Sequence, residues 1–183
     1  MPVLLNLHHP GAEFLPGRTQ PGLCELTGAL IIDRARGLGY CGLSERCDEA
    51  GAAAMHAAFG LRGTLMFDLA PGEYHTNVVM SVLAGRALVL CPAGFADPAA
   101  AAGIASIYAP HVVELTPAQK ASFAGNGIAL SPGRVWLSEA GASSLTAQQH
   151  ARLQQAGFDV GRVPLDEIEK AGGSLRCCVA EIY

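Results

Sequence analysis

The 183-residue sequence has few charged residues, 15% of the chain, and few aromatic residues, 6%. Lys and Arg number only 12 and are scattered, so the clustered basic face that nucleic-acid binding needs is missing. No apolar run approaches the roughly 18 residues of a transmembrane helix. Residues 1–10 carry no basic flank and no long apolar stretch, so we expect them to be neither a signal peptide nor a membrane anchor. We therefore expect a cytoplasmic protein that binds neither nucleic acid nor membranes.

The six cysteines do not follow the spacing of the usual cysteine-rich classes. No C-x-x-C pair occurs, and Cys177 and Cys178 are adjacent, which suits neither a zinc ribbon nor a disulfide framework. His8 and His9 could bind a metal, but no further ligands follow at metal-site spacing. The sequence thus predicts no metal and no cofactor. Three cysteines are expected to be small residues of the core: Cys41, Cys91 and Cys178.

An internal repeat organises the chain. Gly28, Asn77 and Asn126 each begin a β-type apolar stretch, and successive starts are 49 residues apart. Each stretch meets a glycine-containing turn and then a second apolar stretch, a pattern that predicts a β-hairpin. A helix and a further short strand follow in each unit. The expected strands are 28–32, 39–43 and 64–69, then 77–81, 87–91 and 112–115, then 126–130, 135–138 and 159–163, and the expected helices are 45–59, 98–108 and 147–155.

A period of about 50 residues is typical of propellers, solenoids and pseudo-symmetric arrays. The single helix in each unit argues against an all-β blade. Residues 175–183 are expected to form a strand that begins a fourth unit. The alternative is an ordinary α/β domain whose elements happen to be evenly spaced, but three equal spacings with matching turns favour the repeat.

Three reactive side chains lie at the beginnings of units. Glu25 precedes the first unit, His75 precedes the second, and Cys177 lies at the start of the fourth. Equivalent positions in a pseudo-symmetric array point at a common axis, so these residues could meet in one pocket. A thiolate nucleophile, a histidine that moves protons and a carboxylate that orients its neighbours form a coherent catalytic group. Arg176 lies beside the thiol and follows a glycine turn at 172–173.

Each of these residues also has a purely structural interpretation. A cysteine in an apolar strand usually packs in the core, and a histidine is more often an ordinary core or surface residue. Periodicity alone leaves open whether Cys177 and His75 act together or only pack.

Three separated motifs carry the most specific signal. They are Glu73-Tyr74-His75-Thr76-Asn77-Val78-Val79-Met80, Phe123-Ala124-Gly125-Asn126 and Gly172-Gly173-Ser174-Leu175-Arg176-Cys177. Together, and in this order, they resemble the guanidino-group-modifying enzymes, the pentein superfamily. The branch they resemble is the arginine-deiminase-related citrulline-utilisation hydrolases, often called amidinotransferase-like. The similarity runs from about Glu25 to the last residue.

The resemblance implies an α/β fold of the pentein type, a pseudo-symmetric array of five ββαβ units that forms a five-bladed α/β propeller. This chain would hold about three and a half of the five units. A single, N-terminally incomplete domain over residues 1–183 is therefore expected, with repeats near 25–70, 75–116, 123–164 and 173–183. Missing units would leave apolar edges open, which favours a homo-oligomer.

The resemblance also implies residue roles. Cys177 would attack the guanidinium or ureido carbon and form a covalent intermediate. His75 would act as general acid to the leaving amine and then as general base for water. Glu25 would bind the substrate nitrogens, Asn77 would line the same pocket, and Arg176 is expected to bind substrate. The implied activity is a cysteine-dependent hydrolase of an arginine- or citrulline-like amino acid that needs no cofactor.

The sequence departs from the family pattern at two positions. Leu26 follows Glu25 where relatives have a glycine-containing stretch, and Asn77 stands where deiminases have an aspartate. A neutral amide suits a ureido group better than a cation, which favours citrulline over arginine. The alternatives are an amidinotransferase, a dimethylarginine hydrolase, and an inactive pentein fragment or binding module.

Overall fold

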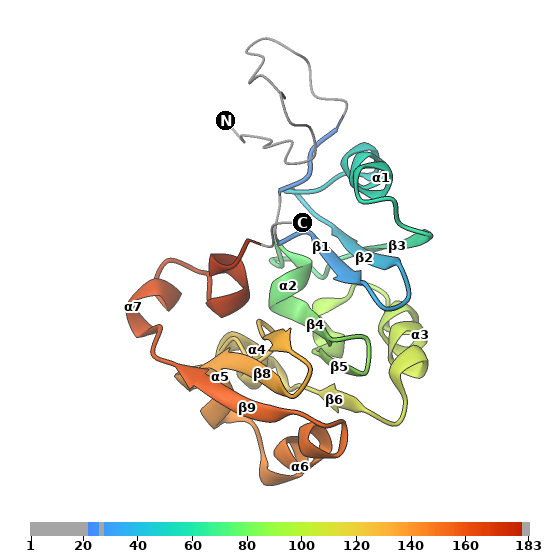
Figure 1. The fold of residues 1–183 in the computed structure, drawn as a ribbon. Coiled ribbons are helices and arrows are strands. Elements are labelled where there is room, and N and C mark those ends of the chain that lie inside the picture. Colours follow the sequence, from blue (N-terminus) through green and yellow to red (C-terminus); the bar gives the residue numbers. More distant parts are fainter. Residues whose placement is uncertain (1–21, 26–27, 181–183) are drawn as a thin grey trace.

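The structure, a computed structural model, describes residues 22–25 and 28–180. Three three-stranded sheets of the same construction follow one another along the chain, from blue to red in Figure 1. In each sheet the first two strands form an antiparallel hairpin, and the third strand joins parallel to the second. The predicted order of strand, strand, helix and strand is thus confirmed in three successive units. No helix in the described ranges has the length and apolar character to cross a membrane.

The bounds of the elements follow the repeat. The first unit comprises β1 (Leu30–Asp33), β2 (Leu38–Leu43), α1 (Glu49–Ala58) and β3 (Gly63–Asp68). The second comprises β4 (Met80–Leu83), β5 (Ala87–Leu90), α3 (Pro98–Tyr108) and β6 (Val112–Glu114). The third comprises β7 (Ile128–Ser131), β8 (Arg134–Ser138), α6 (Ala147–Gln155) and β9 (Asp159–Val163). Four shorter helices lie between these elements, namely α2 (Thr76–Val79), η1 (Pro92–Gly94), α4 (Pro117–Ala121) and α5 (Glu139–Ser144), and two follow β9, namely α7 (Asp166–Glu169) and η2 (Leu175–Cys178).

The helix beginnings follow from their capping residues. The Asp97 carboxylate accepts a hydrogen bond from the Ala99 amide at 2.8 Å, and proline occupies the first position of α3, as predicted. Thr146 forms a capping box with Gln149 at the start of α6. Helix α1 begins at residue 49 and not at 45, because Asp48 is its cap and accepts from the Gly51 amide at 2.7 Å.

Four strand predictions need correction. The first unit's first strand begins at residue 30 and not at 28. Residues 76–79 form α2 and the strand begins only at Met80, because Thr76 donates to the Ala29 carbonyl and accepts from the Gly42 amide. The third unit's first strand begins at residue 128 and not at 126. Residues 175–178 form a 3-10 helix where a strand was expected, because backbone groups there bond to Asn126; residues 181–183 lie outside the described part.

The core consists of three apolar clusters that fill the space between neighbouring sheets and their helices. The first lies between the second and third sheets, the next joins the first and second sheets with α3, and the last lies under α1. In Figure 1, α1, α3 and α6 lie along the periphery of the molecule, whereas α2 lies between β1 and β4. Apolar burial therefore holds each unit against the next.

Arginines in the hairpin turns connect successive units. The Arg36 guanidinium binds the buried Asp33 carboxylate at 2.9 Å and donates to the Gly85 carbonyl, 49 residues further along the chain. Arg86, in that second turn, donates in the same way to the Pro132 carbonyl of the third turn. The repeat is thus visible in polar contacts as well as in strand order.

Candidate active site

Glu25 and His75 form a direct pair. The His75 Nε2 atom lies 2.9 Å from Glu25 Oε2, and the His75 side chain is only 13% exposed. Arg46 Nη1 lies 3.2 Å from the same carboxylate oxygen. The pair joins the segment before β1 to the residue before α2, so the one-unit spacing of the sequence corresponds to a contact in space.

Close packing of backbone fixes the position of His75. A Cβ atom at Gly28 would lie 2.3 Å from His75 Nδ1, so only glycine leaves room for the ring. The Asn77 amide donates to the Gly28 carbonyl at 2.9 Å. His75 therefore begins α2 against the first unit and faces Glu25.

Cys177 lies in η2 against two asparagine side chains. Its Sγ lies 3.4 Å from Asn77 Nδ2 and 3.3 Å from Asn126 Nδ2, with Asn77 Oδ1 at 3.6 Å. The Asn126 Oδ1 atom accepts from the Arg176 amide at 2.9 Å, and Asn126 Nδ2 also donates to the Asn77 carbonyl at 2.8 Å. These contacts bring the thiol to the same short helix that His75 begins. The amide nitrogens of Asn77 and Asn126 are thus both directed at the sulfur.

The remaining predicted site residue, Arg176, takes a different place. Its backbone amide contacts Asn126, while its guanidinium donates to the Val179 carbonyl at 2.9 Å. Of the predicted site residues, the structure thus joins Glu25 to His75 and Asn77 to Cys177. Leu26, His8 and His9 lie outside the described residues.

Two residues of this site were not singled out from the sequence. Asn126 starts a predicted strand and ends one of the three family motifs, but it had no predicted role in the site; its position one repeat after Asn77 could have identified it. Arg46 carries no spacing signal, because its contact with Glu25 depends on the loop between β2 and α1. Arg46 and Tyr74 both line a cleft of about 360 Å³ between residues 43–46 and 69–74.

The cysteines separate into buried and accessible groups. Cys24, Cys41, Cys47 and Cys91 are buried, Cys177 is half-buried and Cys178 is exposed. The core prediction is therefore correct for Cys41 and Cys91 and wrong for Cys178. Within the described ranges, the residues with metal-ligand spacing are Cys24, Cys41 and Cys47, whose sulfurs lie within 4.8 Å of one another.

Burial sets the charge state of His75. Desolvation lowers the pKa of His75 below its ordinary 6.5, although the Glu25 carboxylate opposes this shift by favouring the imidazolium. The lowered pKa makes His75 a neutral imidazole at pH 7, able to accept a proton from a thiol.

The lowered pKa gives a pH dependence that can be measured. We expect alkylation of Cys177 by 2-chloroacetamidine, a small amidinium, to stay fast down to pH 6.5 and to slow only below it, because His75 stays neutral there. Rates measured from about pH 5 to 8 test this. In Glu25→Gln the opposing carboxylate is gone, so the acidic decline should move to lower pH. Faster alkylation on acidification would mean that imidazolium, and not imidazole, activates the thiol.

The sequence is similar to a known protein family and to a known relative. A family model described as "N,N dimethylarginine dimethylhydrolase, eukaryotic" matches residues 17–183. An N(G),N(G)-dimethylarginine dimethylaminohydrolase of Mycobacterium tuberculosis (strain ATCC 25618 / H37Rv) is 29% identical over 142 residues. That match covers 78% of this chain and 44% of the relative, so the chain spans less than half of the relative's length.

Solved structures share the fold. The product-bound N-terminal domain of ArgZ, a cyanobacterial arginine dihydrolase, superposes with a TM-score of 0.73 at 20% identity, over 85% of this chain and 55% of that one. AgrE in complex with ornithine and NAD+ superposes with a TM-score of 0.71 at 22% identity, over 85% of this chain and 22% of that one. A dimethylarginine dimethylaminohydrolase adduct with S-methyl-L-thiocitrulline superposes with a TM-score of 0.60 at 18% sequence identity, over 84% of this chain and 56% of that one.

These similarities confirm the α/β architecture with the sheets and helices of pentein enzymes. The sequence match also shows the family, because the family model matches residues 17–183, nearly the whole chain. The chain belongs to the N,N dimethylarginine dimethylhydrolase family, within the superfamily of guanidino-modifying enzymes that its motifs resemble.

Proposed function

We propose that this protein hydrolyses a C–N bond of a guanidino amino acid, with Cys177 as the nucleophile. The observation that supports this most is the position of Cys177 Sγ, 3.4 and 3.3 Å from the amide nitrogens of Asn77 and Asn126. The His75–Glu25 pair supplies a proton acceptor and donor at the beginning of the same helix as Asn77. A nucleophile, a base and a carboxylate that orients the base form the usual activated group.

The first half of the reaction forms a thioether-like intermediate. Neutral His75 accepts the Cys177 proton, and the thiolate sulfur adds to the guanidinium carbon. Imidazolium then gives that proton to the leaving nitrogen, the C–N bond breaks, and a neutral amine departs. The substrate carbon stays bound to sulfur as a thiouronium cation, and Glu25 is a nearby carboxylate that can bind its nitrogens.

Water completes the cycle. His75, neutral again, accepts a proton from a water molecule that attacks the thiouronium carbon. The C–S bond then breaks and returns the thiolate, leaving a ureido amino acid. The proton on His75 returns to the Cys177 thiolate, and the extra proton of the ureido product goes to the released amine, so no metal, oxidant or cofactor enters the balance.

The substrate class that we infer is dimethylarginine. The family match and the M. tuberculosis relative both carry that name, which stands among the alternatives that the motifs left open. Glu25 would supply the negative charge for a guanidinium that the neutral Asn77 does not. The citrulline-type substrate favoured by Asn77 alone, and an arginine-type substrate, are the competing choices within the same chemistry.

Turnover with three substrates tests the proposal. We expect dimethylamine and a ureido product from dimethylarginine, because its dimethylated nitrogen is the leaving group. Purified protein is incubated with dimethylarginine, arginine or citrulline, and amine, ammonia and amino-acid products are quantified by mass spectrometry. His75→Ala is the control, since it removes the proton carrier. Ammonia from arginine or citrulline, with no dimethylamine, would move the assignment to a deiminase or citrulline hydrolase.

A binding module without catalysis is the second candidate. It is among the alternatives that the motifs left open, and the chain spans 44% of its M. tuberculosis relative. Absence of turnover with all three substrates, together with measurable binding of any one by calorimetry, would support this candidate.

We further infer that the three sheets belong to a pentein propeller of five units. The repeats near 25–70, 75–116 and 123–164 would each supply one unit, and 173–183 would begin another. The contacts of Arg36 with Gly85 and of Arg86 with Pro132 support equivalent junctions between units. A homo-oligomer would bring further units beside the open sheets, which sedimentation would detect.

A further inference from the structure

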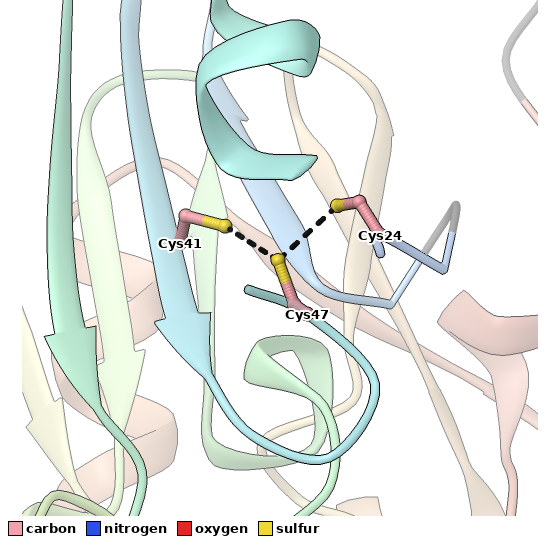
Figure 2. Close-up of side chains that lie close together, drawn as sticks. All are labelled: Cys24, Cys41 and Cys47. Carbon is pink, nitrogen blue, oxygen red and sulfur yellow. Dashed lines mark hydrogen bonds between the residues drawn. The ribbon is translucent and has the colours of Figure 1, made fainter. Parts of the chain in front are cut away.

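Three buried thiols, those of Cys24, Cys41 and Cys47, lie close together beside the segment that carries Glu25. The Cys47 Sγ lies 3.3 Å from Cys24 Sγ and 3.4 Å from Cys41 Sγ. Figure 2 shows Cys47 between the other two, with all three sulfurs directed at one another. All three sulfurs lie within 4.8 Å of one another, and none of the three residues is more than 6% exposed.

The backbone holds the three thiols from three separate segments. Cys24 precedes β1, Cys41 lies on β2, and Cys47 lies in the loop before α1. Cys24 and Cys47 face each other in an isolated antiparallel bridge, in which Asp48 N donates to Leu23 O at 2.8 Å. The sulfurs are therefore brought together by ordered main-chain contacts and not by flexible side chains alone.

The surroundings favour a soft ligand. The cluster around the thiols is made of apolar side chains, among them Ala52 and Met55. No carboxylate or imidazole of the described residues joins the three sulfurs within the same spacing. Oxygen-seeking ions such as Mg²⁺ and Ca²⁺ therefore lack ligands here, whereas thiolates select Zn²⁺ and Cu⁺.

We propose that Cys24, Cys41 and Cys47 form a binding site for one thiophilic d¹⁰ cation, Zn²⁺ or Cu⁺. Three sulfurs around an ion at about 2.3 Å lie about 4 Å apart in a plane, so the observed trio needs only a small expansion. Binding replaces the thiol protons, which are released to solvent, with metal–sulfur bonds. A Zn²⁺ ion would complete its tetrahedron with one exogenous ligand, while Cu⁺ is satisfied by three thiolates.

The site would stabilise the arrangement of the neighbouring dyad. Cys24 precedes Glu25, and Cys47 follows Arg46, the residue that binds the Glu25 carboxylate. An ion that joins the two cysteines also joins the two segments that carry these charges. The site is chemically separate from Cys177, and its existence does not depend on the proposed hydrolase activity.

Metal binding is tested in a chain without its accessible thiols. Reduced Cys177→Ser/Cys178→Ser protein is mixed anaerobically with an excess of Zn²⁺ or, in a second arm, Cu⁺, then desalted and analysed by elemental mass spectrometry. We expect one ion per chain in at least one arm, and X-ray absorption should give three sulfur neighbours at about 2.3 Å. Competition with a chromophoric chelator of each ion decides which of the two is bound more tightly.

Variants locate the bound ion. Cys41→Ala and Cys47→Ala should each weaken metal retention at least about a hundredfold, because each removes one of the three thiolate ligands and leaves a weaker site with two. Cys91→Ala, which removes another buried thiol, should retain one ion per chain. Circular dichroism checks that each variant is folded. If a variant does not fold, the number of sulfur neighbours that X-ray absorption gives for the protein with all three cysteines still tests the site.

Three results would overturn the proposal. The first is that neither ion stays with the reduced protein. The second is retention unchanged in folded Cys47→Ala. The third is that X-ray absorption of a retained ion shows fewer than three sulfur neighbours.

Discussion

Cys177→Ser is expected to abolish alkylation by 2-chloroacetamidine at neutral pH, with a rate loss on the order of a thousandfold or more. The reason is that Cys177 Sγ is the accessible thiol that lies within 3.4 Å of two amide nitrogens, those of Asn77 and Asn126. The thiolate is the reactive form of a cysteine, and in the proposed mechanism His75 accepts the Cys177 proton. Intact-protein mass spectrometry over time gives the rate, and peptide mapping gives the position.

Cys178 is the matched control. It is adjacent in sequence and more exposed than Cys177, so access alone would make it the faster residue. Cys178→Ser should therefore leave the alkylation rate of the protein unchanged. Equal labelling of Cys177 and Cys178 in the wild-type chain would show that exposure, and not activation, governs reactivity, and the nucleophile assignment would have to be abandoned.

Gly28→Ala is expected to lower the reactivity of Cys177 and any turnover about a hundredfold, since displacements near 1 Å in an active site have effects of this size. The new methyl group would lie 2.3 Å from His75 Nδ1 and 2.5 Å from its Cγ, so the imidazole must move away from Glu25. Alkylation rates of the variant, compared with His75→Ala, measure how much of the histidine's contribution is lost.

Gly63→Ala provides the comparison at a site that has room. A Cβ at Gly63 in β3 would meet only a Leu38 methyl at 3.5 Å, which is an ordinary contact. We expect this variant to react like wild type, and the melting temperatures of both variants show whether either has lost its fold. A folded Gly28→Ala protein with wild-type reactivity would mean that the position of His75 is not needed.

Much of the fold was predictable because the hairpin turns and helix caps are local signals. The 49-residue spacing, the Asp97 cap and the Thr146 cap each correspond to an observed element. The error at residues 76–79 arose from Val78 and Val79, whose β-branched side chains predict a strand. Their helix forms because neighbouring residues bond to the first unit, a contact that local sequence does not contain.

The site was predictable only where it repeated. Glu25 and His75 lie about one unit apart, and their contact follows from pseudo-symmetry. The same rule applies to Asn126, yet its motif indicated the family and not a role for this side chain in the site. Arg46 and the Cys24–Cys41–Cys47 trio fall outside the period, because loop geometry and not repetition brings them together.

The distribution of the site along the chain has a consequence for the timing of its reactivity. Glu25 lies near the beginning of the described chain, Cys177 lies near its end, and Asn77 and Asn126 come from separate units between them. During synthesis, Cys177 emerges after all these partners, so the proposed nucleophile can meet them only once every unit has docked. In the proposed mechanism, this order protects the growing chain from premature chemistry at the thiol.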